Sequence, residues 1–472
     1  MNASDVIQRD VVIVGGGLAG AAAALALSAD PAVSGTIALL DRRPTLGGRA
    51  YSYAHPALGE VVDSQHVLLG CCTNLVELIT QAGVAESIRW YDELTFLEPD
   101  GSRSRLYPGD LPAPSHQAMS FLRAPMMSFA DKLGIARGLL GFLRGYPADD
   151  TESFATWLRR TRQTPRSIQH FWEPVVLATL NDAFESCSTK YAGKVFHESF
   201  LRSPQAGRLG IPRLPLSDWL APLTVQAQSQ GVDVHLKTSM MRLEPIESTC
   251  VSRTQRWRVH TEAGVYDTPN VILAIDFKQV RGILAGLPGG EGEAEKLDHF
   301  VAAPITTIHL WYDKAVIDLD HAVLLDTRIQ WIFTKSRIRG WHAAHGTYCE
   351  LVISASWPEL KEGREAILAS ALEELAFFFP AVQGAKLLKS CVLKEARATF
   401  SVTPGLDRYR PAQATQWPGL MLAGDWTATE WPATMEGAVR SGRLAAGVVA
   451  GEPKRYLSPE LPATGLMPLL IR

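Results

Sequence analysis

The sequence has no C-x-x-C pair among its six cysteines, which stand at positions 71, 72, 187, 250, 349 and 391. This spacing argues against a disulfide framework or a structural zinc site, and it favours a reducing compartment. The chain also lacks a run of about 18 apolar residues, so no helix is expected to span a bilayer. The N-terminus, MNASDVIQRD, has no apolar signal core, and we therefore expect a cytoplasmic protein. The cysteine spacing leads us to expect no bound metal.

An excess of charge is missing as well, because 46 basic residues face 49 acidic ones. Nothing in this balance attracts the whole protein to nucleic acid. There is no internal repeat and no low-complexity tract. What remains is a chain of 472 residues, 46% of them apolar, which predicts a globular protein with two or more structural units.

The most informative stretch near the start is VVIVGGGLAGAAAALALS. A buried strand over 11–14 is followed by Gly15, Gly17 and Gly20 and then by an Ala-rich helix. This G-x-G-x-x-G spacing permits a tight turn and brings backbone N–H groups close to a pyrophosphate at the helix N-terminus. The next strand, TIALLD, ends at Asp41, where a carboxylate is expected to hold ribose hydroxyls. A glycine-rich turn without a ligand is the alternative, and the matching strand, helix and acid argue against it.

Two further segments decide which dinucleotide is expected. LGGRA, 46–50, and GDWTATEWPATMEGAV, 424–439, resemble signatures of the amine oxidase and phytoene desaturase flavoprotein superfamily. The resemblance implies non-covalently bound FAD. In it Arg49 neutralises pyrophosphate, Asp425 binds the ribityl or phosphate region, and a helix opening at Met435 directs N–H groups to the flavin.

The stretch from GVDVHLKTSMMRLEP to VYDTPNVILAI reads as strands joined by turns, and Met240 is expected to touch adenine through its backbone. The residues expected around the cofactor are Gly15, Gly17, Leu18, Ala19, Gly20, Asp41, Arg42, Gly47, Gly48, Arg49, Gln65, His66, Met240, Gly424, Asp425, Met435 and Glu436.

The predicted fold class is α/β. A Rossmann-like, glutathione-reductase-type FAD-binding domain is interrupted by a discontinuous α+β substrate domain with helices and an antiparallel sheet. The cofactor domain is expected in 1–75, 206–285 and 405–472. The substrate domain is expected in 76–205, which is helical, and in 286–404, whose strands are TTIHLWYD, IQWIFTKS, YCELVISAS and LLKSCVLKEA.

Four segments extend the resemblance to one branch of the superfamily. QHVLLGCCTNLVELITQAGV, FWEPVVLATLND, ATFSVTPGLDRYRP and GDWTATEWPATMEGAVRSGR are similar to the hydroxysqualene dehydroxylases, the squalene-associated flavin desaturases of bacterial hopanoid pathways. These enzymes tend to have Asn before a small residue ahead of the Gln-His pair, where this chain has Asp63 and Ser64.

The resemblance implies that reduced flavin and hydroxysqualene give squalene, water and oxidised flavin. An allylic hydroxyl leaves readily only when it receives a proton. His66, beside Gln65 and expected near the flavin, is one candidate donor, although both residues could merely shape their loop. Glu173 is another, because an apolar setting raises a carboxyl pKa, although it could simply begin a helix. Asn181 could orient the hydroxyl or could cap a helix.

Aromatic residues are expected to wall the substrate channel, because a π-face stabilises an allylic cation. The candidates are Trp172, Trp311, Phe400 and Trp426, and ordinary core packing is the alternative for each of them.

In SFADKLGIARGLLGFLRG, 128–145, a stripe of apolar residues recurs at helical spacing. Its members are Phe129, Leu133, Ala136, Leu140 and Leu143, and Lys132, Arg137 and Arg144 flank them. This pattern predicts either a helix that lies on the inner face of the cytoplasmic membrane or one packed within its own domain. The apolar tail GLMPLLIR could dip into the same interface.

Three functions are compatible with this predicted fold. The favoured one is dehydroxylation, with an electron donor that the sequence does not name. A phytoene-type desaturase would run hydride transfer in the opposite sense, from hydrocarbon to flavin. A non-catalytic isoprenoid carrier would not need every flavin contact, and the complete set of cofactor motifs argues against it.

Overall fold

The computed structural model describes residues 6–33, 35–246, 255–342 and 345–471. Residues 1–5, Cys250 and Arg472, which the sequence analysis considered, lie outside the described residues.

A five-stranded parallel sheet forms the centre of one part of the molecule. Its strands, in spatial order, are β11 (Asp233–Leu236), β3 (Ile37–Asp41), β2 (Val11–Val14), β15 (Asn270–Leu273) and β21 (Leu420–Leu422). Except for β11 at the edge, they read as apolar runs because both faces of the sheet are covered. The strands come from three distant stretches of the chain, so the predicted discontinuous Rossmann-like core is confirmed.

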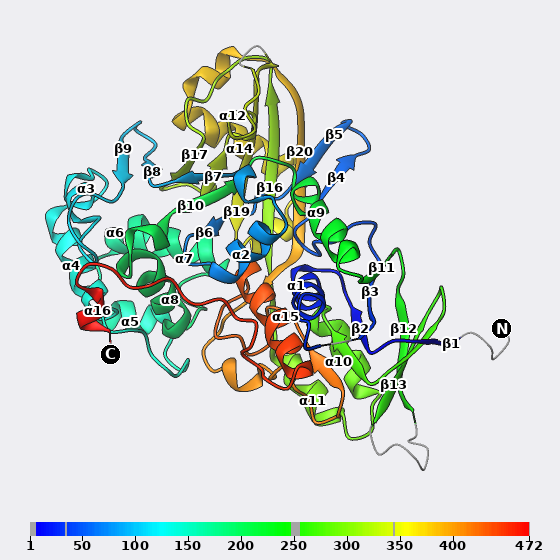
Figure 1. The fold of residues 1–472 in the computed structure, drawn as a ribbon. Helices are drawn as coiled ribbons and strands as arrows, with labels where there is room; N and C mark the ends of the chain where they lie inside the picture. The colour runs from blue at the N-terminus through cyan, green and yellow to red at the C-terminus, as the bar shows by residue number, and fades with distance from the viewer. Residues whose placement is uncertain (1–5, 34, 247–254, 343–344, 472) are drawn as a thin grey trace.

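Helices α1 (Leu18–Ser28) and α15 (Met435–Val449) pack side by side against this sheet (Figure 1). The Ala-rich sequence of α1 permits a close approach. A Cβ on Gly442 of α15 would stand 1.9 Å from the carbonyl oxygen of Ala19. Only glycine fits there, so the two predicted cofactor helices are held backbone against backbone.

The predicted middle meander is confirmed as part of a four-stranded sheet. Its order is β1 (Val6–Gln8), β14 (Val265–Thr268), β13 (Arg256–Thr261) and β12 (Met240–Ile246). Strand β12 begins at Met240, directly after the turn that follows β11.

A seven-stranded sheet dominates the other part of the described structure. Its order is β20 (Leu387–Phe400), β16 (Ala302–Tyr312), β19 (Thr347–Ser354), β18 (Trp331–Phe333), β17 (His321–Leu324), β8 (Leu94–Leu97) and β9 (Arg103–Leu106). The four predicted strands form the antiparallel part. Strands β8 and β9 come from the segment predicted to be helical, and β8 joins β17 in parallel.

Two small sheets complete the strand pairings. Strand β10 (Leu209–Pro212) pairs with both β6 (Leu68–Leu69) and β7 (Ile88–Tyr91), and β4 (Ser52–His55) pairs with β5 (Glu60–Asp63). Strand β10 therefore joins one strand from each side of the predicted boundary at position 75. The predicted domain boundaries stay a prediction.

Most remaining helices gather in a layer at one side of the molecule or cover the sheets (Figure 1). The chain-ordered set is α2 (Thr73–Gln81), α3 (Ala118–Arg123), α4 (Phe129–Leu140), α5 (Phe154–Arg160), α6 (Pro165–Ser167), α7 (Glu173–Leu180), α8 (Thr189–Val195), α9 (Leu216–Ser229), α10 (Phe277–Ala285), α11 (Glu291–Lys296), α12 (Lys335–Ile338), α13 (Trp357–Lys361), α14 (Arg364–Phe378) and α16 (Met467–Leu470). Among the described residues, none of the helices has the length and apolar character that crossing a bilayer requires.

The C-terminal stretch runs from α15 across the molecule to α16, which lies beside the α3–α5 layer (Figure 1).

Helix α4 is the helix predicted to carry the apolar stripe, and it ends at Leu140, earlier than the predicted residue 145. It begins with a capping box in which Ser128 and Asp131 satisfy each other's backbone N–H groups.

Candidate active site

The glycine turn between β2 and α1 is as tight as its sequence predicts. Gly15 has φ +107°, and a Cβ there would stand 2.3 Å from the Ala274 carbonyl oxygen. A Cβ on Gly20 would stand 1.8 Å from the Gly15 carbonyl oxygen. No side chain caps the N-terminus of α1 at Gly17, so its first N–H groups remain available for an anion.

The second glycine pair lies directly against this turn. Gly47 has φ +121° and donates its N–H to the Gly16 carbonyl oxygen at 2.9 Å. A Cβ on Gly48 would stand 2.9 Å from the Cα of Gly17. Two predicted cofactor loops therefore form one backbone cradle, which fits the diphosphate of a dinucleotide.

Asp41 stands at the end of β3, as predicted, and is buried. One carboxylate oxygen accepts the Gly16 N–H at 2.5 Å, and the other accepts the Arg43 N–H at 2.6 Å. The side chain thus stabilises the glycine turn. Its contact with ribose stays a prediction, as does that of Arg42, whose side chain is exposed.

Arg49 and Asp425 meet although 376 residues separate them, with 2.6 Å between Nη2 and Oδ1. Arg49 also donates to the Ala398 carbonyl oxygen at 3.1 Å. Asp425 follows Gly424, whose φ of +143° turns the chain at the end of β21. The fold therefore brings the first and last predicted cofactor segments to one place, with the Arg49 guanidinium directed to Asp425.

The side chain of Glu436 is engaged away from the predicted cofactor site, and a contact of its backbone with the flavin stays a prediction. Glu436 is buried, and its carboxylate accepts the Leu75 N–H at 2.8 Å and the Asn74 side-chain amide at 2.9 Å. Its side chain thus caps α2, and burial raises its pKa. The start of α15 at Met435 is capped separately by Thr434, which accepts the Gly437 N–H at 3.1 Å.

Hydrogen bonds to Glu350 and to backbone carbonyls of the loop itself hold the segment that carries Gln65 and His66. The Gln65 N–H donates to Glu350 Oε1 at 2.8 Å, and the Gln65 side chain donates to the His66 carbonyl oxygen at 2.8 Å. His66 Nδ1 lies 2.9 Å from the Ser64 carbonyl oxygen, so it acts as a donor there. The other ring nitrogen, Nε2, is then the one left for chemistry.

Sequence reasoning missed the group that supports this loop. Lys335 is almost fully buried between Asp63, with which it pairs closely, and Glu350, whose Oε2 lies 2.5 Å from its Nζ. Arg339 adds a contact to Asp63 at 3.3 Å. Two cations thus neutralise two buried carboxylates. The lysine two residues after the buried strand WIF was the one signal in the sequence that could have indicated this group.

Burial and the charges of this group together shift the pKa values around the loop. Burial opposes ionisation of Asp63, but Lys335 and Arg339 outweigh it and lower its pKa. Burial raises the pKa of Glu350 and lowers that of His66. A neutral imidazole is a weak proton source, so the preference for His66 as the acid is not supported by this environment.

Glu173 is the candidate acid whose surroundings favour the protonated form. Its side chain is partly buried, and burial raises its pKa, with a smaller contribution from Glu185. Within the described residues, its carboxyl makes no hydrogen bond or ion pair. It follows directly on the π-helix η2 (Ile168–Trp172), a rare helix form that is frequent at functional sites.

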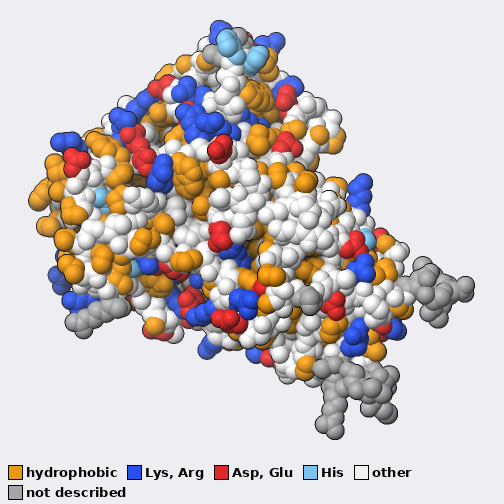
Figure 2. All heavy atoms as spheres, in the orientation of Figure 1, with side chains coloured by type: hydrophobic (Ala, Val, Ile, Leu, Met, Phe, Trp, Pro, Cys, Tyr) orange, Lys and Arg blue, Asp and Glu red, His pale blue; other side chains and the backbone are white. Residues whose placement is uncertain are grey.

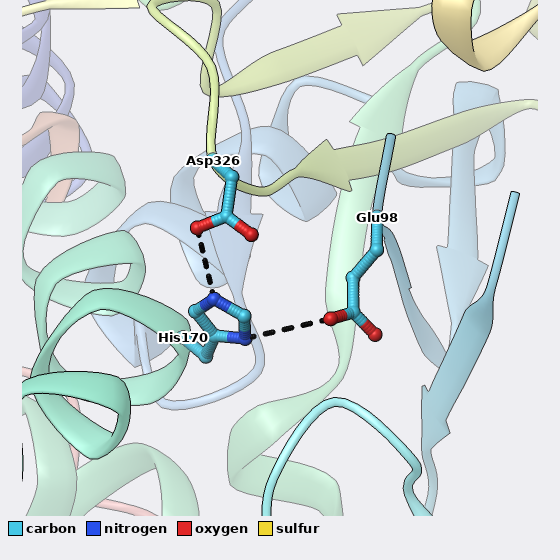
Figure 3. A group of neighbouring side chains, drawn as sticks. All are labelled: Glu98, His170 and Asp326. Carbon is cyan, nitrogen blue, oxygen red and sulfur yellow. Dashed lines mark hydrogen bonds and ion pairs between the residues drawn. The ribbon is translucent and has the colours of Figure 1, made fainter. Parts of the chain in front are cut away.

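A cluster of charged side chains anchors η2 to the seven-stranded sheet (Figure 3). His170 Nε2 lies 2.9 Å from Asp326 Oδ1, and its Nδ1 lies 3.0 Å from the Met126 carbonyl oxygen and 3.9 Å from Glu98 Oε1. Glu98 also pairs with Arg166 at 2.7 Å. Because both ring nitrogens already face oxygen atoms, we interpret the cluster as a tie that fixes the start of α7.

A family model named "Flavin containing amine oxidoreductase" matches residues 18–450. The chain belongs to this family. FAD is its cofactor, and the residues of the cradle fit such a dinucleotide. A 15-cis-phytoene desaturase from Synechococcus elongatus is 25% identical over 460 residues, covering 93% of this chain and 95% of the relative. A zeta-carotene desaturase from Synechocystis is 23% identical, covering 94% and 98%.

The similarity extends to solved structures. An oxidoreductase from Methanosarcina mazei superposes with a TM-score of 0.70 at 16% identity, covering 94% of this chain and all of that one. A cyclohexylamine oxidase from Brevibacterium oxydans gives a TM-score of 0.65 at 17% identity. These likenesses show the fold alone. The family match and the desaturase relatives show that the chain is an FAD-dependent oxidoreductase.

For Asn181 the structure bears out the helix-cap alternative. The residue ends α7 with φ +51°, the left-handed conformation of a helix cap. Its side chain donates to Thr399 Oγ1 at 2.9 Å and accepts the Ala355 N–H at 2.7 Å. Both ends of the amide are thus engaged in joining α7 to the large sheet, which does not support its predicted catalytic role.

The four predicted channel aromatics lie in different surroundings, and all are buried. Trp172 is enclosed by the rings of Phe154, Trp157, Phe171 and Phe196, which is ordinary core packing.

The other three lie closer to the cofactor segments or the loop. Trp311 stacks on Tyr348 with 4.3 Å between ring centroids, and Phe400 lies under the Arg410 guanidinium at 5.3 Å. Trp426 donates to the Ile275 carbonyl oxygen at 3.0 Å. Their contact with substrate stays a prediction.

Arg410 is a second residue whose role sequence reasoning missed, although the segment that carries it was recognised. It is buried, and Nη2 donates to the carbonyl oxygens of Asp425, Thr427 and Trp431 at 2.6–2.8 Å. One guanidinium thus organises the loop between Asp425 and α15. Interior polar contacts of this kind leave no periodic trace in the sequence.

Proposed function

We propose that this FAD-dependent oxidoreductase removes the allylic hydroxyl of hydroxysqualene reductively, in squalene and hopanoid biosynthesis. The products would be squalene and water. Reduced FAD, when bound, supplies the hydride that replaces the hydroxyl group. The electron donor that reduces the cofactor remains to be identified, and no nucleic acid is expected among the partners.

The observation that carries the proposal is the environment of Glu173. Hydroxide is a poor leaving group, so the protein must place a protonated acid at the hydroxyl oxygen. A partly buried carboxyl with a raised pKa and no partner among the described residues can hold such a proton. A desaturase would not need this acid.

The other candidate residues support this step indirectly. The Lys335 group holds the loop with Gln65 and His66 in one backbone arrangement. His66, being neutral, can accept a hydrogen bond at Nε2 and so orient a substrate hydroxyl. We therefore assign the proton donation to Glu173 and an orienting role to His66.

A phytoene-type desaturase is the second candidate, because the relatives named above carry that activity in their names. It would take hydride from a hydrocarbon and end with reduced flavin. An isoprenoid carrier without catalysis is disfavoured, since the glycine cradle, Asp41 and the Arg49–Asp425 pair are all complete.

Product analysis after anaerobic incubation tests the proposal. Photoreduced protein is mixed with hydroxysqualene, and the extracted lipids are separated by chromatography. Squalene is the expected product. Unchanged hydroxysqualene, together with conversion of phytoene by the oxidised protein in the presence of a quinone, would instead establish the desaturase.

A further inference from the structure

Large apolar side chains are exposed together at one end of the molecule, where α3, α4 and α16 lie (Figure 2). Leu469 is 82% exposed, Phe129 75%, and Leu133 and Leu140 each 63%. We call this set the docking face; its members are Leu111, Met119, Leu122, Phe129, Leu133, Leu140, Leu466 and Leu469. Apolar groups of this size rarely gather on the surface of a protein that stays in water.

Internal contacts hold the elements of the docking face together. Lys132 of α4 is buried, and its Nζ donates to the Leu122 carbonyl oxygen at the end of α3, at 2.8 Å. This corrects the prediction that Lys132 flanks the stripe at the surface. The Leu466 N–H donates to the Ala113 carbonyl oxygen at 2.8 Å, and Met467 is fully buried beneath it. The face is therefore a preformed part of the fold.

The exposed charge along the α3 and α4 part of the face is mostly positive, with Asp110 as its exposed acid. Between residues 103 and 144 the sequence contains only two acids, Asp110 and Asp131. Asp131 is buried in the capping box of α4, whereas Arg123, Arg137 and Arg144 are exposed. Apolar side chains beside arginines, with almost no exposed carboxylate among them, match the surface of an anionic bilayer.

A hollow of about 390 Å³ opens at the C-terminal end of α4. Arg137 and Arg144 contribute to its lining together with Tyr146, and so does Arg160, which is already paired with Glu152 at 3.0 Å. Guanidinium groups bind phosphate readily, so the hollow suits a lipid headgroup next to inserted apolar side chains.

We propose that the docking face inserts into the surface layer of an anionic membrane, with α4 lying in the interface plane and α16 beside it. The partner is a lipid bilayer rather than a second copy of the chain, because a self-complementary contact would bring the arginines of two copies together. The inference deepens the proposed function, since an apolar isoprenoid substrate resides in the bilayer, but the docking itself requires no turnover.

Vesicle flotation in the absence of substrate tests the docking. Holoprotein is mixed with vesicles of equal parts phosphatidylglycerol and phosphatidylcholine, and with phosphatidylcholine alone. The double variant L133Q/L140Q should bind the anionic vesicles on the order of 100-fold more weakly than the wild type, because two leucines no longer enter the lipid. The wild type should bind neutral vesicles more weakly than anionic ones.

Matched exposed residues elsewhere provide the control. Phe377 of α14 is 64% exposed and Leu388 of β20 is 53% exposed, both outside the docking face. The variant F377Q/L388Q should float with vesicles as the wild type does. Far-ultraviolet circular dichroism and thermal melting of both variants confirm that they are folded.

Three results would overturn the docking proposal. The first is that the wild type floats with neither kind of vesicle. The second is that folded L133Q/L140Q floats as well as the wild type. The third is that the wild type sediments as a dimer and this variant as a monomer, with no change in flotation. If Leu133 and Leu140 prove necessary for folding, the single change Leu469→Gln on α16 provides a second test, with weaker flotation expected. If the wild type floats as expected but does not convert hydroxysqualene, the proposed function is contradicted and the docking proposal stands.

Discussion

At the scale of single residues, the chemistry depends on which side chain carries a proton at neutral pH. The surroundings separate the two candidates in opposite directions, because burial raises the pKa of Glu173 and lowers that of His66. A carboxyl with a raised pKa remains partly protonated at a higher pH, whereas the imidazole loses its second proton at a lower one.

Replacing Glu173 with Gln should slow reoxidation of the reduced flavin by hydroxysqualene about 10²–10⁴-fold, the usual contribution of a positioned acid. In the wild type the rate should fall as pH rises through the pKa of Glu173, since only the protonated form donates. Stopped-flow absorbance across a pH series measures both effects. The Gln variant should lose this limb of the pH profile.

Glu185 offers a matched control, because its negative charge helps to raise the pKa of Glu173. In Glu185→Gln the fall in rate should move to lower pH, while the rate at low pH should stay near that of the wild type. A near-normal rate for Glu173→Gln, combined with a slow His66→Ala variant, would reverse the assignment of the acid.

Asp41→Ala should weaken FAD binding by about 1.5–3 kcal/mol, the size of hydrogen bonds to a charged group. The structure adds a reason beyond ribose binding, because Asp41 accepts the N–H groups of Gly16 and Arg43 in the glycine turn. Fluorescence titration of the apoprotein with FAD measures the change. An affinity equal to that of the wild type would show that Asp41 supports neither the turn nor the cofactor.

At the scale of elements, the loop with Gln65 and His66 depends on a buried ionic group from α12, β5 and β19. Lys335→Met should destabilise the fold by roughly 3–5 kcal/mol, because Asp63 and Glu350 lose their common cation. Denaturant unfolding measures this loss.

Lys389 provides the comparison, since it pairs with Glu60 at 2.5 Å but is 39% exposed. Lys389→Met should change the free energy of unfolding by about 1 kcal/mol or less. Equal effects of the two lysine changes would mean that the buried group does not hold the loop. In a folded Lys335→Met protein, a shifted visible flavin spectrum would show that the loop reaches the cofactor.

Much of the fold could be predicted from local patterns. The glycine spacing, the apolar strands around it and the strand-forming runs of β16, β19 and β20 each specify an element by themselves. The pairing of β8 with β17 could not be predicted, because no local signal shows which distant strand completes a sheet. Arg410 and Lys335 were missed for a related reason, since a buried charge is recognised only through partners that the chain folding supplies.

At the scale of the whole molecule, three separate stretches of the chain build the parallel sheet of the cofactor domain, and the predicted cofactor segments call for no covalent bond to flavin. The purified protein should therefore be yellow, and acid precipitation should release all of its FAD. Absorbance of the supernatant and the pellet measures the release. Flavin retained in the pellet would indicate a covalent link, and a folded, colourless protein that takes up no FAD would favour the carrier.

The direction of hydride transfer is the central claim, and one paired experiment tests it most directly. Under anaerobic conditions, photoreduced protein is mixed with hydroxysqualene and, in parallel, oxidised protein is mixed with phytoene, while the visible flavin absorbance is followed. The proposed function predicts that hydroxysqualene restores the oxidised flavin spectrum with one squalene formed per flavin and that phytoene leaves the spectrum unchanged. Bleaching by phytoene, with no response to hydroxysqualene, would contradict it.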